Sequence, residues 1–339
     1  MAIRRVAALT GTLTMLAFAA WPGTGLHAAS ATGTVFFPNP VQATGNENLT
    51  DNKDADAPAF ASAYHRVTLT HLDNSGTLSG DYVTVKSNTG KAARMVGGAF
   101  PDYHRDVDQF EQVMGYYWVT TAQEYIQHLG FGSTLRPVNE RQIELRIGQF
   151  GGDNSFFRDD KANITLGKGG VDDGEDAEVI VHEYGHSVQD AQVPGFGTGN
   201  ESGAIGEAFG DYLAVAVTSW KTGSPTLTPE PCVADWDSVS YTSSAPHCLR
   251  RIDGDKHYPD DVENEVHADG EIWSRALWDI RNSLGDTEAS TIIIEAQFDF
   301  AVDTSFADAA DATVAAAQRL YGAAAANAVH AAFAARGIL

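Results

Sequence analysis

Basic residues are scarce in this sequence of 339 residues. It contains 22 lysines and arginines against 45 aspartates and glutamates, a formal net charge of −23. A surface this acidic repels the phosphates of nucleic acids, so no nucleic-acid partner is expected. Long apolar runs are absent beyond the first 31 residues, so we expect no membrane span in the mature chain. With 43% hydrophobic residues, including 6 Trp, 11 Tyr and 16 Phe, the sequence instead predicts a folded protein with a large core.

The first 31 residues have the pattern of an export signal. Arg4 and Arg5 supply positive charge, residues 6–20 are uncharged and mostly apolar, and residues 29–31 (ASA) fit a cleavage site. A short membrane anchor or a buried helix is the alternative interpretation. We expect the mature chain to begin near Thr32 and to be secreted, extracellular and monomeric.

Cysteine is rarer still. The chain has only Cys232 and Cys248, both in a loop rich in Pro and Ser. In an oxidising compartment, one disulfide across that loop is the expected state. A pair of zinc ligands is the alternative, but no CxxC spacing supports it.

Residue patterns predict an α+β fold. Residues 32–105 contain β-rich runs separated by turn residues, which predicts strands and turns. The periodicity then predicts a helix over 106–129 and strands over 141–147 and 163–166, with a polar stretch at 151–160. The second half is predicted to be helical around a long loop, 222–261, with helices over 176–192, 201–220, 271–284, 289–302 and 307–333. The expected division is a signal peptide (1–31), a β-rich segment (32–105), an N-terminal lobe that contains the helix with the sequence HEYGH (106–195) and a helical C-terminal lobe (196–339).

The sequence HEYGH at 182–186 indicates metal chemistry. On a helix, residues four apart share one face, so the imidazoles of His182 and His186 can reach one cation. Glu183 projects close to that face without being a ligand, and there it can act on a water held at the metal.

A second segment supplies a third ligand. Glu207 lies 21 residues after His186, among apolar residues, and an acid on such a helix needs a partner. With Glu207, the donor set becomes two histidines and one glutamate, which leaves a zinc position open for water. Asp211 lies one turn further on and can hold a ligand imidazole through its second nitrogen. A solvated surface acid is the alternative interpretation of Glu207.

These segments, HEYGH at 182–186 and GAIGEAFGDY at 203–212, resemble the thermolysin-like gluzincins, most closely the fungalysin family and its bacterial relatives. Three further stretches agree: DNSFF at 153–157, VHADGEIW at 266–273 and VHAAFAARGI at 329–338. The resemblance implies a thermolysin-like zincin fold and a zinc metalloendopeptidase that acts on proteins or peptides. The whole-chain expectation is therefore a β-rich N-terminal lobe and a mainly α-helical C-terminal lobe, with the zinc helix between them.

The resemblance also implies individual roles. His182, His186 and Glu207 would bind zinc, and Glu183 would be the general base. Asp211 would orient His182. His267, placed just before a predicted helix, would donate a hydrogen bond to the oxyanion of the intermediate; a surface histidine in an acidic segment is the alternative. On an edge strand, Asn154 and the Ser155 backbone would bind the substrate main chain.

The sequence departs from the family in two places. Residues 193–197 (VPGFG) carry no hydroxyl that could act as a second oxyanion donor, and residues 212–229 carry no carboxylate for a double calcium site. A single calcium ion could still be bound by four acids before the zinc helix, although we favour a solvated acidic loop: Asp172, Asp173, Asp176 and Glu178.

Two other functions remain open at this point. A non-catalytic relative could keep the metal and serve as an extracellular binding domain. A zinc aminopeptidase would need an anchor for the free amine of its substrate, and the sequence has no GxMEN-like string.

Overall fold

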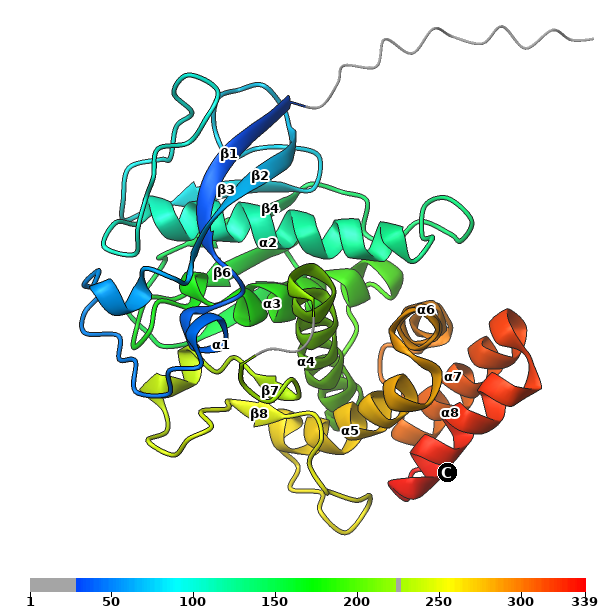
Figure 1. The fold of residues 1–339 in the computed structure, drawn as a ribbon. Helices are drawn as coiled ribbons and strands as arrows, with labels where there is room; N and C mark the ends of the chain where they lie inside the picture. Colours follow the sequence, from blue (N-terminus) through cyan, green and yellow to red (C-terminus); the bar gives the residue numbers. More distant parts are fainter. Residues whose placement is uncertain (1–28, 224–226) are drawn as a thin grey trace, which may run out of the picture.

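Strands β1 and β2 lie at the start of the part that the computed structural model describes, residues 29–223 and 227–339 (Figure 1). β1 (Ala29–Phe36) pairs antiparallel with β2 (Tyr64–Leu72), and together they form a separate two-stranded sheet. Most of the predicted export signal, residues 1–28, lies outside the described residues. Its last residues belong to β1, where Ala31 is buried and pairs with Leu69.

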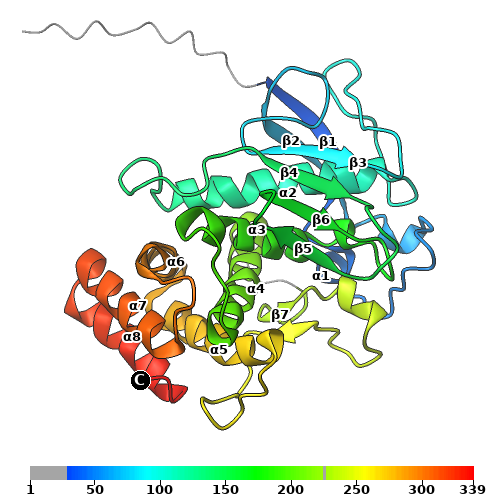
Figure 2. The ribbon, with the colours of Figure 1, turned by 180° about the vertical axis from the view of Figure 1, so that it is seen from behind.

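A four-stranded sheet forms the wall of the N-terminal lobe, with the strand order β3-β4-β6-β5 (Figure 2). β5 is antiparallel to β6, and the other neighbours are parallel. The periodicity marked 151–160 only as a polar stretch, whereas the resemblance implied an edge strand at Asn154 and Ser155, and β5 lies there. An edge strand with one partner needs no apolar run, so its sequence resembles that of a loop. The bounds are β3 (Val83–Ser87), β4 (Ile143–Ile147), β5 (Ser155–Arg158) and β6 (Asn163–Leu166).

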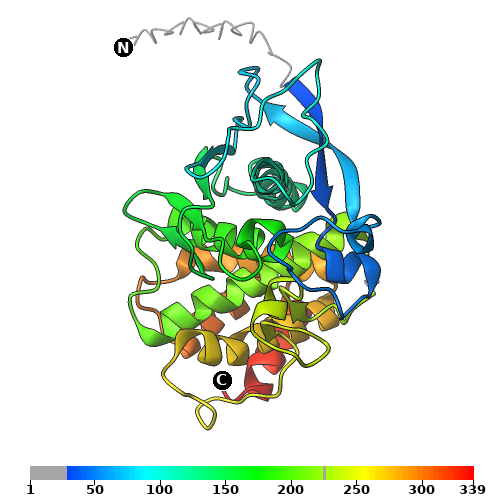
Figure 3. The same cartoon turned by 90° about the vertical axis from the view of Figure 1, so that its left-hand side faces the viewer.

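Two helices fill the N-terminal lobe. α2 (Gln109–His128) is buried around most of its circumference, because it packs against β1, β3 and α3 (Figure 3). α3 (Ala177–Gln192) begins where the Asp176 carboxylate accepts a hydrogen bond from the Glu178 N–H at 2.9 Å. Both helices confirm the periodicity of the sequence to within a few residues.

The second half is helical, as predicted, but three boundaries were wrong. α5 begins five residues before the predicted start, because the Glu265 carboxylate caps the N–H groups of His267 and Ala268. Gly322, with φ +84°, splits the predicted helix 307–333 in two. The predicted helix 289–302 ends at Ala296 and continues as a short 3-10 turn, η4 (Gln297–Asp299). The bounds are α4 (Asn200–Thr222), α5 (Val266–Leu284), α6 (Asp286–Ala296), α7 (Phe306–Tyr321) and α8 (Ala323–Ala335).

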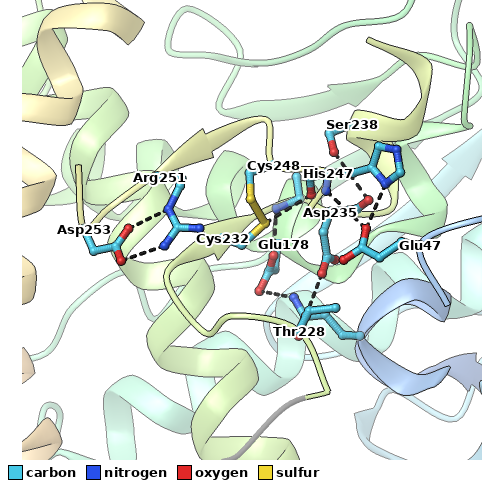
Figure 4. Close-up of a disulfide and its surroundings, with 12 residues drawn as sticks. Glu47, Glu178, Thr228, Cys232, Asp235, Ser238, His247, Cys248, Arg251 and Asp253 are labelled. Atoms are coloured by element: carbon cyan, nitrogen blue, oxygen red, sulfur yellow. Dashed lines mark hydrogen bonds and ion pairs between the residues drawn. A yellow bond between two sulfur atoms is a disulfide. The ribbon is translucent and has the colours of Figure 1, made fainter. Parts of the chain in front are cut away.

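The predicted loop at 222–261 contains short ordered pieces. Cys232 and Cys248 form a disulfide that closes its central part (Figure 4). His247 Nδ1 lies 2.8 Å from Glu47 Oε2, so this loop is tied to the N-terminal segment. The remaining short elements are α1 (Pro40–Thr44), η1 (Pro58–Phe60), η2 (Asp173–Glu175), β7 (Cys232–Val233), η3 (Asp237–Ser240) and β8 (Arg250–Arg251).

No helix within residues 29–223 and 227–339 has both the length and the hydrophobicity that a bilayer crossing needs.

Candidate metal centre

Three side chains from two helices meet at the junction of the lobes. His182 and His186 come from α3, and Glu207 comes from α4. The two Nε2 atoms lie 3.2 Å apart, Glu207 Oε2 lies 3.2 Å from His182 Nε2, and Glu207 Oε1 lies 3.6 Å from His186 Nε2. The spacing of the two histidines and the later glutamate in the sequence thus corresponds to one convergent group in space.

Glycines allow α3 and α4 to approach this closely. A Cβ atom added at Gly185 would lie 3.0 Å from the Gly210 Cα, and one added at Gly210 would lie 2.6 Å from His182 Nδ1. Any side chain at Gly210 would therefore push the His182 ring away from Glu207. The apolar faces of both helices are buried in the main core, which keeps the helices in this register.

The group fits a tetrahedral metal. Ligand atoms about 2.0–2.1 Å from a zinc ion are about 3.3 Å from one another in a tetrahedron. The three separations of 3.2, 3.2 and 3.6 Å agree with that value. Glu207 Oε2 is also buried without a hydrogen-bond partner among the residues that the structure describes. Two imidazoles and a carboxylate are a donor set that suits zinc.

Asp211 fixes the orientation of His182. Its Oδ1 lies 2.8 Å from His182 Nδ1, so Asp211 can accept the Nδ1–H and leave the Nε2 lone pair directed toward Glu207. Arg250 donates two hydrogen bonds to the same carboxylate, at 2.6 and 2.7 Å. Burial acts in the opposite direction, but Arg250 and His182 lower the pKa of Asp211 to about 2.

Glu183 lies beside the convergent group without joining it. Its side chain is buried, and its Oε2 has no hydrogen-bond partner within the described part of the chain. Burial raises the pKa of Glu183 to about 8, although His182 opposes the shift. The carboxylate nevertheless reaches the wall of a cavity of about 460 Å³, which His182, His186 and Glu207 also line.

His267 faces the same cavity from the first turn of α5. Its Nε2 lies 3.4 Å from Glu207 Oε2, and its Nδ1 lies 2.7 Å from Glu265 Oε1. The side chain is 51% exposed, so it can turn toward a molecule in the cavity. The structure thus brings His267 next to the convergent group of His182, His186 and Glu207.

Asn154 and Ser155 lie at the start of β5 and line the opposite wall. Asn154 is exposed, and the Ser155 hydroxyl donates to the Asp173 carboxylate. Among the strands of residues 29–223 and 227–339, β5 pairs only with β6, so the backbone groups of its other edge are available to an extended peptide.

Known proteins share these features. Residues 195–338 match the thermolysin metallopeptidase alpha-helical domain. The C-terminal part of the chain is therefore similar in sequence to the helical domain of the thermolysin metallopeptidases. It is 28% identical over 133 residues to "Extracellular metalloproteinase 2" of Phaeosphaeria nodorum, and this match covers 34% of the chain and 20% of that protein. It therefore spans about a fifth of the length of that relative.

The fold agrees along nearly the whole chain with a solved structure of this family. The precursor of protealysin, a metalloproteinase from Serratia proteamaculans, superposes with a TM-score of 0.61 at 15% identity, over 90% of this chain and 99% of that one. The expected α+β thermolysin-like fold, with a strand-rich N-terminal part and a helical C-terminal domain, is confirmed.

Three residues around this site were not predicted from the sequence. Arg250 follows Cys248 in a segment without periodicity, so only the fold shows that it binds Asp211. Glu265 could have been recognised as a helix cap two residues before His267. Tyr241, from the disulfide loop, lines the cavity and donates to the backbone carbonyl of Asp153 at 3.0 Å.

The prediction of a solvated acidic loop before the zinc helix was wrong. All four acids are buried, because η2 and the start of α3 lie under the disulfide loop. The four carboxylates also do not converge on one point. Asp176 accepts a hydrogen bond from the Glu178 N–H, and Glu178 accepts one from Gln42. Asp173 instead lies close to Asp153 and Asp237. The acids concerned are Asp172, Asp173, Asp176 and Glu178.

Proposed function

We propose that the protein is a secreted zinc endopeptidase that hydrolyses peptide bonds, with Glu183 as the general base. The observation that carries the proposal is the position of the buried Glu183 carboxylate, which faces the cavity beside the convergent group of His182, His186 and Glu207. A metal site that only stabilised the fold would need no free carboxylate at that position.

The two histidines and Glu207 would hold the zinc ion. When bound, zinc supplies a Lewis acid for a water molecule and for the carbonyl of the substrate. Asp211 keeps His182 in the tautomer whose Nε2 can coordinate, and Arg250 keeps Asp211 ionised.

Glu183 would move the proton. It takes a proton from the attacking water and delivers it to the nitrogen of the departing amine, so the peptide C–N bond breaks without a free amide anion. A buried carboxylate can hold that proton between the two transfers, because burial stabilises its neutral form.

His267 would donate a hydrogen bond from Nε2 to the oxyanion that forms on the carbonyl oxygen. Glu265 orients the ring because it lies at the other nitrogen, Nδ1. Asn154 and the backbone of Ser155 would bind the substrate main chain along the free edge of β5.

Three observations support an extracellular location. Residues 1–31 have the pattern of an export signal, the chain has a disulfide, and the P. nodorum relative is named as extracellular. Protein or peptide substrates and a monomeric state complete the proposal.

The variant Glu183→Gln tests the role of Glu183. We expect it to keep one zinc ion per chain and to lose about 10³-fold in kcat/KM on an internally quenched peptide with blocked ends, because an amide cannot accept the proton. Zinc is measured by mass spectrometry of the protein after gel filtration. Glu140→Gln, at an exposed acid that does not line the cavity, is the matched control.

The same assays separate the alternatives. Cleavage of casein and blocked peptides identifies an endopeptidase, and cleavage restricted to a dipeptide amide with a free N-terminus identifies an aminopeptidase. Zinc binding without either activity in the unaltered protein would favour a binding domain. Full activity of Glu183→Gln would overturn the role of Glu183.

A further inference from the structure

A second group of acids lies beside the start of β5, and two of its three members line the cavity described above. Asp153 precedes β5, Asp173 begins η2, and Asp237 begins η3 in the disulfide loop. One carboxylate oxygen of each lies within 4.8 Å of the other two. We call these three residues the unmatched cluster.

Each acid of the unmatched cluster has an oxygen that lacks a partner. The Oδ1 atoms of Asp153, Asp173 and Asp237 are buried, and none has a hydrogen-bond partner among residues 29–223 and 227–339. Asp237 is only 4% exposed and Asp173 only 2%. A buried carboxylate oxygen without a donor is costly, so three of them at one place require an explanation.

No basic side chain compensates these charges by direct contact. Within the described ranges, no Lys, Arg or His forms an ion pair with any of the three. The Ser155 hydroxyl donates to Asp173, which satisfies one oxygen of the six. Burial, followed by repulsion from Asp173 and other acids, raises the pKa of Asp237 well above its ordinary value.

We propose that Asp153, Asp173 and Asp237 bind a calcium ion. Oxygen atoms that share one calcium at about 2.3–2.6 Å lie no more than about 5 Å apart, which the cluster satisfies. The donors are all carboxylates, which hard cations prefer, and they lie at irregular positions on three segments, which calcium tolerates better than magnesium. The three oxygens have almost no accessible surface, which favours a bare ion over a basic side chain of a substrate.

The ion would join the substrate strand to the disulfide loop. Asp153 is next to Asn154, and Asp173 holds Ser155, whereas Asp237 belongs to the loop whose Tyr241 donates to the Asp153 carbonyl. Calcium would therefore fix the start of β5, where we place the main chain of the substrate. This consequence for peptide binding rests on the proposed function, whereas the calcium site itself does not.

Titration of CaCl2 into the zinc-loaded protein, followed by calorimetry, tests the site. We expect one calcium ion per chain, and an affinity at least about tenfold weaker in Asp173→Asn and in Asp237→Asn, because each removes one anionic ligand. Asp159→Asn is the control, because Asp159 is an exposed acid that lines the same cavity outside the cluster. MgCl2 is titrated in parallel.

Thermal unfolding supplies a second readout that does not depend on activity. At the same calcium concentration, calcium should raise the Tm of the unaltered protein by more than that of Asp237→Asn, because the variant binds the ion more weakly. In calcium-free buffer, Asp237→Asn should melt no lower than the unaltered protein, since it removes a buried carboxylate without a partner. A variant that merely misfolds would melt lower in both buffers and would lose its zinc.

Three results would overturn the proposal: no calcium binding by the unaltered protein, equal affinity in the two cluster variants, or an equal loss in Asp159→Asn. A response to magnesium alone would overturn the choice of ion. Peptide cleavage is measured separately, so cleavage without calcium binding refutes only this site, and calcium binding without cleavage refutes only the proposed peptidase.

Discussion

Two groups of buried acids lie only a few residues apart in the sequence, yet their surroundings are opposite. In the first, which we call the matched cluster (Asp176, Glu178 and Asp235), every carboxylate oxygen accepts a hydrogen bond. The donors are side chains and backbone N–H groups from four parts of the chain: Asn39, Gln42, Glu178, Thr218, Thr228, Ala234, Trp236 and Asp237. Figure 4 shows Thr228 directed at Asp235 in this group. In the unmatched cluster, three oxygens have no donor among the described residues.

The comparison shows two ways to bury negative charge. The matched cluster uses hydrogen-bond donors that the protein itself supplies. In the unmatched cluster, one oxygen of each acid has no such donor among the described residues. Because Asp235 and Asp237 are two residues apart in one loop, the difference arises from the partners that surround each acid and not from the local sequence.

The largest effect should follow from converting the matched cluster into an unmatched one. Asn39 Nδ2 donates to Asp235 Oδ1 at 2.6 Å, and Asn39→Asp replaces this donor with another acid of the same shape. We expect the free energy of unfolding in calcium-free buffer to fall by about 3–5 kcal/mol, the usual cost of leaving a buried charge uncompensated. Urea denaturation followed by circular dichroism measures the change.

The design of Asn39→Asp keeps the helix cap intact. The Asn39 Oδ1 accepts from the Gln42 N–H at 2.9 Å, and an aspartate can accept the same bond, so a loss cannot be assigned to α1. Asn327→Asp, at an exposed position of α8, controls for the added charge. An unchanged urea midpoint in Asn39→Asp would show that the matched cluster does not depend on its donors.

A smaller effect is expected from opening the loop that carries Asp235 and Asp237. The disulfide closes 16 residues, and a loop of that length stabilises a fold by about 3 kcal/mol. The double variant Cys232→Ser/Cys248→Ser should lose about that much in urea denaturation and should bind calcium more weakly. Dithiothreitol should lower the free energy of unfolding of the unaltered protein by the same amount and leave that of the double variant unchanged. Equal free energies of unfolding for the two proteins without dithiothreitol would refute the prediction.

The contrast between the clusters also shows what the sequence can and cannot predict about the fold. The helices around HEYGH and Glu207 were predicted well, because amphipathic periodicity is a local property. β5 gave no periodic signal, because an edge strand needs no apolar run, and only the resemblance implied a strand there. The early start of α5 was missed because a capping glutamate, not an apolar residue, precedes it.

For the site, the metal ligands were recognisable because their spacing is set by one helix and one following segment. The acids before the zinc helix were misjudged as solvated, because their partners Asn39 and Gln42 lie more than 130 residues earlier. Arg250 was missed for the same reason: its role depends on a contact with Asp211, 39 residues away, across a loop without a pattern.

The smallest effect should appear where a buried carboxylate is matched by a cationic side chain. Asp211 accepts from Arg250 and lies beside His182 Nδ1, so Asp211→Asn keeps the shape and removes the charge. We expect zinc affinity to fall about 10–100-fold, because the imidazole becomes a weaker and less oriented ligand.

Competition with a chromogenic chelator measures this affinity. The matched control is Asp190→Asn, because Asp190 also lines the cavity and pairs with an arginine, Arg141. If Asp211→Asn bound zinc as tightly as the unaltered protein, the carboxylate would serve only to bury Arg250, and this third way of matching charge would have no part in the metal centre.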